Sequence, residues 1–201
     1  TRKTFIYNTF EKLMKAISKS LKKNDPNHLN LGIRYGYIEQ LDDELLRISK
    51  ESFDALSFNC YALSPDHEKM NHALEISGLP MIIGEYHFGT VDRGLAQSLW
   101  QVNSQKERGD AFRYYTENAF AHRGLIGTGW FRWIDQNING RTDGENYNCG
   151  FIDVTDRPYP YMVDAAIETA KSLYEIHFGT KTPFHQAPNA VGHSPIPNLW
   201  E

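Results

Sequence analysis

A carboxylate at the end of a short apolar segment is the residue of this sequence best placed to do chemistry. Glu85 closely follows Met81–Ile83, an apolar run after a Gly–Leu–Pro turn that is typical of a strand buried on both faces. Carboxylates at the carboxyl ends of buried parallel strands lie where α/β barrels place catalytic groups. Glu85 is therefore a candidate nucleophile. The simpler alternative is a strand-end glutamate that caps a helix or pairs with an arginine.

Composition restricts the kinds of partner that this chain could have. Its 201 residues are 40% hydrophobic and carry a formal net charge of −4, which describes a globular protein able to bury a core. The mild acidity and the lack of a Lys/Arg run argue against nucleic acid and membrane surfaces as partners. No apolar run approaches the roughly 18 residues that a membrane-spanning helix needs. The chain also begins without a charged-then-apolar leader, so this end says nothing about secretion.

Cysteines and aromatic residues add two further expectations. Cys60 and Cys149 are too few for a disulfide framework, so we expect two free thiols. The 4 Trp, 11 Tyr and 11 Phe are more than a core of this size requires, and several fall in predicted loops. Exposed aromatic rings suit the C–H faces of sugars, although cores and interfaces use aromatic packing too.

The elements that would position Glu85 alternate between helices and strands. The first helix ends near residues 24–26, and further helices are predicted over residues 42–52, 65–77, 104–122 and 161–176. Strands are predicted over residues 28–36, 53–61, 81–83 and 124–133, with long loops after Gly89 and over 134–160. This alternation predicts a parallel sheet with crossover helices, in about half the number of units that a closed eight-fold barrel needs. The Pro-containing tail, residues 180–201, is predicted to be irregular.

Three segments of the sequence, read together, resemble a known group of enzymes. These are Gly84–Gly94, with Glu85 near its start, Gly129–Gln136 and Gly140–Tyr159. They are similar to the last strands and loops of clan A glycoside hydrolases, which are retaining (β/α)8 barrels, and most similar to the family 50 β-agarases. Asp25–Arg34 and Ser57–Tyr61 resemble the fifth and sixth strands of such barrels, so the resemblance covers about residues 5 to 178.

The resemblance implies that residues 1–179 are the carboxyl-terminal half of such a barrel, about strands 5–8 with their helices. Glu85 falls on the position of the nucleophile. The acid/base glutamate of the clan lies at the end of the fourth strand, normally as Asn–Glu, and no such dipeptide precedes the first helix here. The implied activity is hydrolysis of a β-linked, galactose-containing, agar-like saccharide, with the acid on an absent amino-terminal half. The family also implies a secreted or periplasmic protein with no cofactor.

Several other residues are candidates for binding this substrate or orienting Glu85. Tyr61 and Arg34 could donate hydrogen bonds to Glu85, which would keep its carboxylate ionised. His87 points to the same side of an extended strand as Glu85 and could bind a sugar hydroxyl or orient the nucleophile. Each of these side chains could instead have a purely structural role. His67 and His72 lack the spacing of a metal-binding helix face, so we expect no catalytic metal.

The last predicted strand and the loop after it supply the remaining candidates. Trp130 and Trp133 should point to opposite sides of the strand, and we favour Trp133 as the platform for a sugar ring. The polar loop that follows offers hydrogen-bonding groups for hydroxyls, from Asp135, Glu145 and Asn146. The alternative is a turn-rich loop held by its own side chain–backbone bonds.

Two other classes of function remain open at this point. A non-catalytic, carbohydrate-binding or structural half-barrel would expose sheet edges and apolar surface, so it should pair with its other half, form a homo-oligomer or aggregate. A small flavodoxin-like domain would bind a ligand where the strand order reverses. The absence of a glycine-rich phosphate loop argues against the flavodoxin-like alternative.

Overall fold

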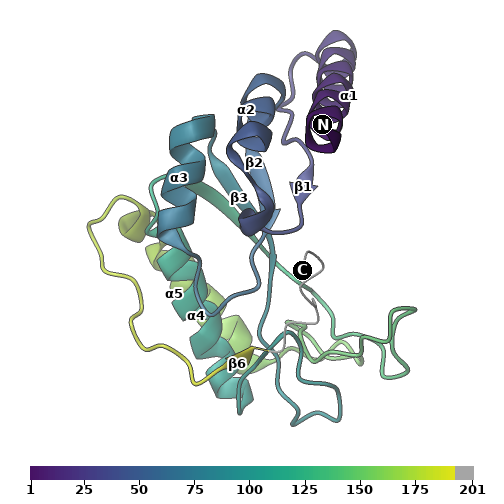
Figure 1. Cartoon of the computed structure of the whole chain (residues 1–201). Coiled ribbons are helices and arrows are strands. Elements are labelled where there is room, and N and C mark those ends of the chain that lie inside the picture. Colours follow the sequence, from purple (N-terminus) through teal and green to yellow (C-terminus); the bar gives the residue numbers. More distant parts are fainter. Residues whose placement is uncertain (193–201) are drawn as a thin grey trace. The chain divides into compact units, whose positions relative to one another are not determined.

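The computed structural model describes residues 1–192 and has a mixed α/β fold (Figure 1). The chain forms two compact units, which are described in turn. Unit 1 comprises residues 1–60, 66–84 and 124–127, and unit 2 comprises residues 61–65, 85–123 and 128 onward.

A parallel sheet forms the centre of unit 1. Strand β1 (Arg34–Tyr35) pairs in parallel with β2 (Leu56–Asn59), and the strand order is β1-β2-β3-β5. Strands β3 (Met81–Tyr86) and β5 (Leu125–Trp130) begin in unit 1 and end in unit 2. The inward-facing apolar side chains of these strands form the core, and five of them are fully buried: Leu56, Phe58, Met81, Ile83 and Leu125. The predicted α/β class with a parallel sheet is thus confirmed.

Side-chain caps explain why two helices of unit 1 begin near their predicted positions. Helix α2 (Asp43–Ser52) starts after Asp42, whose carboxylate accepts a hydrogen bond from the backbone N–H of Leu45. Helix α3 (His67–Ser77) starts after Asp66 in the same way, and it ends at Gly78 with φ of 67°. Such aspartate caps satisfy backbone donors that have no partner within the helix. A short 3-10 helix, η1 (Ile38–Gln40), was not predicted.

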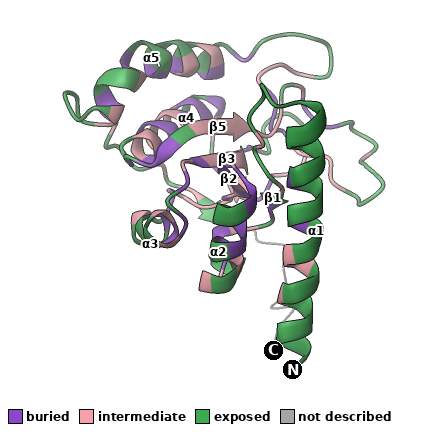
Figure 2. Cartoon of the chain, turned by 90° about the horizontal axis from the view of Figure 1, so that it is seen from above, coloured by how far each residue is buried: buried purple, intermediate pink, exposed green. Residues whose placement is uncertain are grey.

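Helix α1 (Arg2–Asn24) ends near the predicted position, but its apolar face is largely uncovered. Only Met14 and Ser18 are buried, whereas Phe5 is 71% and Leu13 is 53% exposed. Figure 2 shows α1 as exposed along most of its length. The helical spacing of its apolar residues therefore predicted the helix without showing what covers it.

The first strand is much shorter than predicted. A strand was expected over residues 28–36, but only Arg34–Tyr35 pairs with β2. The Asn30 side chain instead makes one local and one distant contact, since its Oδ1 accepts from the Gly32 N–H and its Nδ2 donates to the Ser52 carbonyl. Gly32 has φ of 73°, a left-handed conformation that suits glycine. These contacts keep the segment before Arg34 from being extended.

Two long helices, α4 (Gln105–Phe120) and α5 (Pro160–His177), pack together in unit 2. Gly109 on α4 permits the close approach, because a Cβ there would lie 2.5 Å from the Tyr161 carbonyl oxygen. Both helices agree with the predicted ranges to within a few residues. Their packing leaves the loops after β3 and β5 to carry the polar groups of this unit.

The described part of the tail is attached to unit 2 by specific contacts. The Phe184 N–H donates to Glu117 Oε2 at 2.8 Å, and the Phe184 carbonyl accepts from Asn118 Nδ2 at 3.1 Å. Farther along, β6 (Val191–Gly192) pairs antiparallel with β4 (Trp100–Gln101). Figure 1 shows this segment running from the end of α5 to β6. The irregular tail was predicted over residues 180–201, of which 193–201 lie outside the described residues.

Candidate functional site

Glu85 lies near the end of β3, and its side chain is half-buried in unit 2. The Tyr61 hydroxyl donates a hydrogen bond to Glu85 Oε2 at 2.7 Å. Tyr61 follows the end of β2, the neighbour of β3 in the sheet, so the two side chains come from the carboxyl ends of adjacent strands. A phenol donating to a carboxylate stabilises its charged form and fixes its direction.

His87 supports Tyr61 from a buried position. The rings of the two residues make an edge contact with centroids 4.8 Å apart, and His87 is 2% exposed. The Leu99 N–H donates to His87 Nε2 at 3.1 Å, so the proton lies on Nδ1, which donates to the Phe131 carbonyl at 3.0 Å. Burial lowers the pKa of His87 to about 3, so the ring is neutral at ordinary pH. Since the backbone engages both nitrogens, the ring is arranged to hold its neighbours in place rather than to bind a sugar hydroxyl.

The strand predicted over residues 124–133 ends at Trp130, so Trp130 and Trp133 do not both lie on β5, and their surroundings differ. Trp130 donates from Nε1 to the Cys149 carbonyl at 2.7 Å, and its ring makes edge contacts with Tyr86 and Phe112. Trp133 is 66% exposed and stacks on Phe151, with centroids 5.9 Å apart and an interplanar angle of 21°. Trp133 is therefore the one of the pair with a ring face open to a ligand.

Asp135 is buried beneath the loop that follows β5. Only 3% of it is exposed, and its Oδ2 accepts from Asn148 Nδ2 at 2.9 Å and from the Tyr159 hydroxyl at 2.6 Å. Its Oδ1 accepts from the Gly150 N–H at 2.6 Å. Through these contacts the carboxylate of Asp135 organises the loop, and a role for Asp135 in substrate binding stays a prediction.

Glu145 and Asn146 lie on the outer half of the same loop and are only partly buried. Glu145 Oε2 accepts from Gln136 Nε2 at 2.7 Å and lies 3.3 Å from Arg141 Nη1. The Asn146 carbonyl accepts from the Ala96 N–H, which joins this loop to the loop after β3. Both residues thus take part in holding the loops, and their exposed atoms are within reach of solvent.

Arg34, the remaining predicted site residue, belongs to unit 1. Its side-chain carbons lie over Gly84, where an added Cβ would be 2.2 Å from Arg34 Cδ. Gly84 is the residue before Glu85, so a larger side chain at position 84 would displace Arg34.

Sequence reasoning missed several residues that the tertiary structure brings together in unit 2. The ring of Tyr147 makes an edge contact with His87 at 5.8 Å, and Phe131 supplies the carbonyl that fixes the His87 tautomer. Arg108 and Gln105 on α4 donate hydrogen bonds to Asn148, in the loop after β5, and Gln105 also donates to Asp92, in the loop after β3. Gln105 and Arg108 lie one helical turn apart, which indicates a shared face, but only the fold shows that this face is buried.

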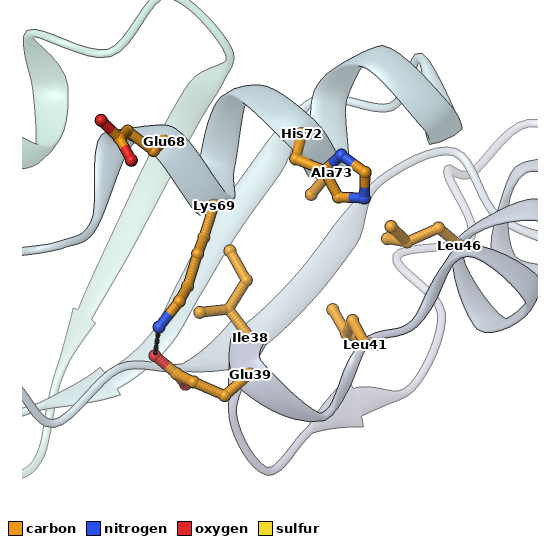
Figure 3. A pocket seen from close by; sticks show the side chains of 8 residues that line it. All are labelled: Ile38, Glu39, Leu41, Leu46, Glu68, Lys69, His72 and Ala73. Carbon is orange, nitrogen blue, oxygen red and sulfur yellow. Dashed lines mark hydrogen bonds and ion pairs between the residues drawn. The ribbon is translucent and has the colours of Figure 1, made fainter.

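A separate hollow of about 270 Å³ lies in unit 1, between η1, α2 and α3 (Figure 3). Ile38, Leu41 and Leu46 give it an apolar floor, and Lys69 on its rim is 3.1 Å from Glu39 Oε1. Glu39 and Glu68 are the carboxylates among the residues that line it. Within residues 1–192, no group of three or more His, Cys, Asp or Glu side chains is arranged to hold a metal ion. No helix in that range is long and apolar enough to cross a membrane. Cys60 and Cys149 are both buried, and neither forms a disulfide within the described residues.

Comparison with known proteins points to one group of enzymes. The chain is 36% identical over 166 residues to β-agarase A of Vibrio sp. (strain JT0107), which covers 79% of this chain and 16% of that protein. Among solved structures, PfGH50B matches with a TM-score of 0.79 and 36% identity over 84% of this chain and 25% of its own. An exo-β-agarase matches with a TM-score of 0.81 and 32% identity over 89% of this chain and 24% of its own. No family model matches the chain.

These relatives bear on the flavodoxin-like alternative raised by the sequence. The chain spans about a sixth of the curated relative and about a quarter of the two solved structures. The similarity to agarases, together with the carboxylate at the end of β3, leaves no support for the flavodoxin-like alternative.

Proposed function

From the similarity of this chain to the β-agarases of glycoside hydrolase family 50, we propose that it forms part of a glycoside hydrolase acting on an agar-like, β-linked, galactose-containing saccharide. The observation that carries this proposal is the hydrogen bond from Tyr61 to Glu85 at the carboxyl ends of adjacent strands. A directed, half-buried carboxylate in that place is suited to attack an anomeric carbon.

The proposed reaction is a double displacement. A carboxylate oxygen of Glu85 attacks the anomeric carbon while a second carboxylic acid gives its proton to the departing glycosidic oxygen, which leaves as an alcohol. Water then attacks the resulting glycosyl ester and gives a proton back to the second carboxylate, so Glu85 returns to its starting state. Tyr61 directs the attacking oxygen throughout, and neutral His87 keeps the Tyr61 ring in position.

We propose that the second carboxylate comes from outside this chain. Retaining enzymes need their two carboxyl groups roughly 5–5.5 Å apart. Glu145, the in-chain alternative weighed from the sequence, is engaged by Gln136 and Arg141 in its own loop. The proposed architecture is therefore the carboxyl-terminal half of a (β/α)8 barrel, about strands 5–8, which works with an amino-terminal half that supplies the acid.

Substrate binding is assigned to groups that are open to a ligand. Trp133 offers a stacked, exposed ring as the floor of a sugar subsite. Glu145 and Asn146 are proposed to meet hydroxyl groups from the loop above. Arg34 stays a predicted contact, and its side chain lies over Gly84, the residue before Glu85 in the sequence.

A trapping experiment tests the nucleophile. The chain is assembled with its amino-terminal half and incubated with a 2-fluoro agaro-oligosaccharide. The fluorine slows hydrolysis of the glycosyl ester, so this intermediate accumulates. The labelled peptide is then mapped by mass spectrometry. We expect the label on Glu85 and a loss of turnover of at least about 1,000-fold in Glu85→Gln. Glu75→Gln, at a carboxylate on α3, is the matched control and should keep full activity. Label on another residue, or retained turnover in Glu85→Gln, would refute the assignment.

The exposed apolar face of α1 favours a second candidate, a non-catalytic half-barrel that acts by pairing with its other half or with a second copy. Size-exclusion chromatography with light scattering tests it. A monodisperse monomer would count against a half-barrel of either kind, whereas an assembled protein that binds saccharide without cleaving it would favour this candidate over the enzyme.

A further inference from the structure

Arg108 is a fully buried charge that the proposed mechanism does not use. It lies on α4 with 0% exposure, and its Nη1 donates to Gln105 Oε1 and to Asn148 Oδ1, each at 2.9 Å. Its Nη2 donates to the Gly150 carbonyl, and its guanidinium lies 4.7 Å from the centre of the Tyr159 ring. A buried guanidinium is costly unless it is paired and hydrogen-bonded.

The charge of Arg108 faces two carboxylates through bridging amides, Asp135 through Asn148 and Asp92 through Gln105. Asn148 accepts from Arg108 on its Oδ1 and donates from its Nδ2 to Asp135 Oδ2 at 2.9 Å. The Tyr159 hydroxyl donates to the same Asp135 oxygen at 2.6 Å. Arg108, Asn148, Asp135 and Tyr159, here called the Arg108 network, therefore form one connected polar group beneath the loop after β5.

One end of the Arg108 network holds the backbone next to the exposed tryptophan. Gly150, whose carbonyl accepts from Arg108, is followed by Phe151, whose N–H donates to the Trp133 carbonyl at 2.8 Å. Phe151 also provides the ring on which Trp133 stacks. A shift of Gly150 would consequently move both supports of the Trp133 ring.

The other end of the network reaches the loop after β3, which leads away from Glu85 and His87. Gln105, the neighbour of Arg108 on α4, donates from Nε2 to Asp92 Oδ1 at 2.7 Å and to Asn148 Oδ1 at 2.8 Å. The Asn148 N–H donates to the Ala96 carbonyl at 3.2 Å. The same few side chains therefore fix two loops against each other and against α4.

We propose that Arg108 is a positioning residue for saccharide binding. Its hydrogen bonds from α4 to Asn148 and Gly150 hold the Trp133 ring in place relative to the loop after β3. This inference rests on the proposed function. Lysine cannot replace Arg108, because one ammonium group cannot match the planar fork that reaches the acceptors on Asn148, Gln105 and Gly150. Displacements of about 1 Å produced by remote substitutions can cost about 100-fold in rate.

Chemical rescue tests this role in the assembled enzyme. We compare Arg108→Ala and Arg108→Lys with Arg113→Lys, a control at an arginine on the same helix that pairs with Glu117 outside the Arg108 network. kcat and KM are measured per active site, counted with the 2-fluoro saccharide, well below the unfolding temperature. We expect kcat/KM to fall about 100-fold in both Arg108 variants, mainly through KM, and to stay unchanged in the control. Low millimolar guanidinium should restore at least tenfold to Arg108→Ala, and methylammonium should not.

The outcomes separate this inference from the proposed function. A folded Arg108→Lys with kcat/KM within threefold of the wild type, or equal rescue by methylammonium, would overturn the positioning role. Should Arg108→Ala fail to fold, Tyr159→Phe keeps the ring beside Arg108 and removes only the hydroxyl, which donates to Asp135 and accepts from Asn148 Nδ2. We expect KM to rise about tenfold in this variant. An unchanged KM there would equally refute the inference. Retained turnover in Glu85→Gln would instead refute the proposed function. In that case, saccharide affinity of the Arg108 variants, measured by tryptophan fluorescence, would still test the positioning role.

Discussion

Glu85 and Asp135 are carboxylates in one unit, and their surroundings are opposite. Glu85 is half-buried and accepts from the Tyr61 hydroxyl, whereas Asp135 is 3% exposed and accepts from Asn148, Tyr159 and the Gly150 backbone. The end of β3 thus presents a directed charge that is open to a ligand. The loop after β5 buries its charge and uses it to hold the backbone in place.

This contrast shows that residue type and motif membership do not by themselves assign a role. Both carboxylates lie in segments that resemble the family 50 motifs, and the sequence offered both as site residues. A buried carboxylate held by several donors stabilises a loop, while an accessible carboxylate with a directed donor can react. Substitutions at the two regions should therefore separate effects on stability from effects on activity.

Removing the buried charge should have the largest effect on stability. Asp135→Asn removes one of the two carboxylates that balance the buried Arg108 guanidinium, so we expect the free energy of unfolding to fall by about 3 kcal/mol. Glu85→Gln, at the half-buried carboxylate, should change it by less than about 0.5 kcal/mol. Urea denaturation followed by circular dichroism measures both values. Equal stabilities of the two variants would remove the distinction between the two regions.

The buried histidine beside Glu85 should make stability depend on pH. The pKa of His87 is about 3 in the folded protein, against 6.5 for an unperturbed histidine. Below pH 6.5 the unfolded chain binds a proton that the folded protein does not, so stability is lost as pH falls from 6.5 towards 3. The loss approaches about 1.4 kcal/mol per pH unit.

Denaturation between pH 7 and pH 5 in wild type and His87→Gln isolates this contribution from that of the carboxylates. The slope of the unfolding free energy against pH should be shallower in His87→Gln. The same slope in both proteins would show that His87 does not remain neutral in the folded state.

Tyr61→Phe tests whether the direction of Glu85 matters. The substitution removes the hydroxyl that donates to Oε2 and keeps the ring against His87. Because hydrogen bonds to charged groups contribute about 1.5–3 kcal/mol, we expect kcat/KM to fall by about tenfold or more, with little change in stability. Tyr114→Phe, on α4, serves as the control, and steady-state kinetics on an agaro-oligosaccharide give the comparison. Unchanged kinetics in Tyr61→Phe would mean that the hydrogen bond does not contribute to the reaction.

Trp133→Ala should have the smallest effect of the set. Removing an exposed ring face should raise KM by about five- to tenfold and leave the unfolding free energy within about 0.5 kcal/mol of wild type. Tyr174→Ala removes a ring that is 79% exposed on α5 and should leave KM unchanged. A similar rise in KM in both variants would indicate a general loss of surface contact, without a platform at Trp133.

Much of the fold could be predicted from local signals. Aspartate caps and turn residues gave the starts of α2 and α3, and apolar runs gave the cores of β2, β3 and β5. The first strand was overestimated because the Asn30 side chain competes for backbone groups, which an apolar pattern does not reveal. Strands β4 and β6 have two residues each and are formed by pairing between distant segments, so no local pattern predicted them.

The sequence by itself determined the parallel α/β class and the place of Glu85 at the end of a buried strand. These depend on periodicity and on neighbours along the chain. Only the tertiary structure decided that Tyr61 donates to Glu85, that His87 is neutral and held by backbone groups, and that Asp135 is buried above Arg108. Burial and hydrogen-bond partners are set by segments that meet only in the folded state, and these two properties decide whether a carboxylate reacts or supports the structure.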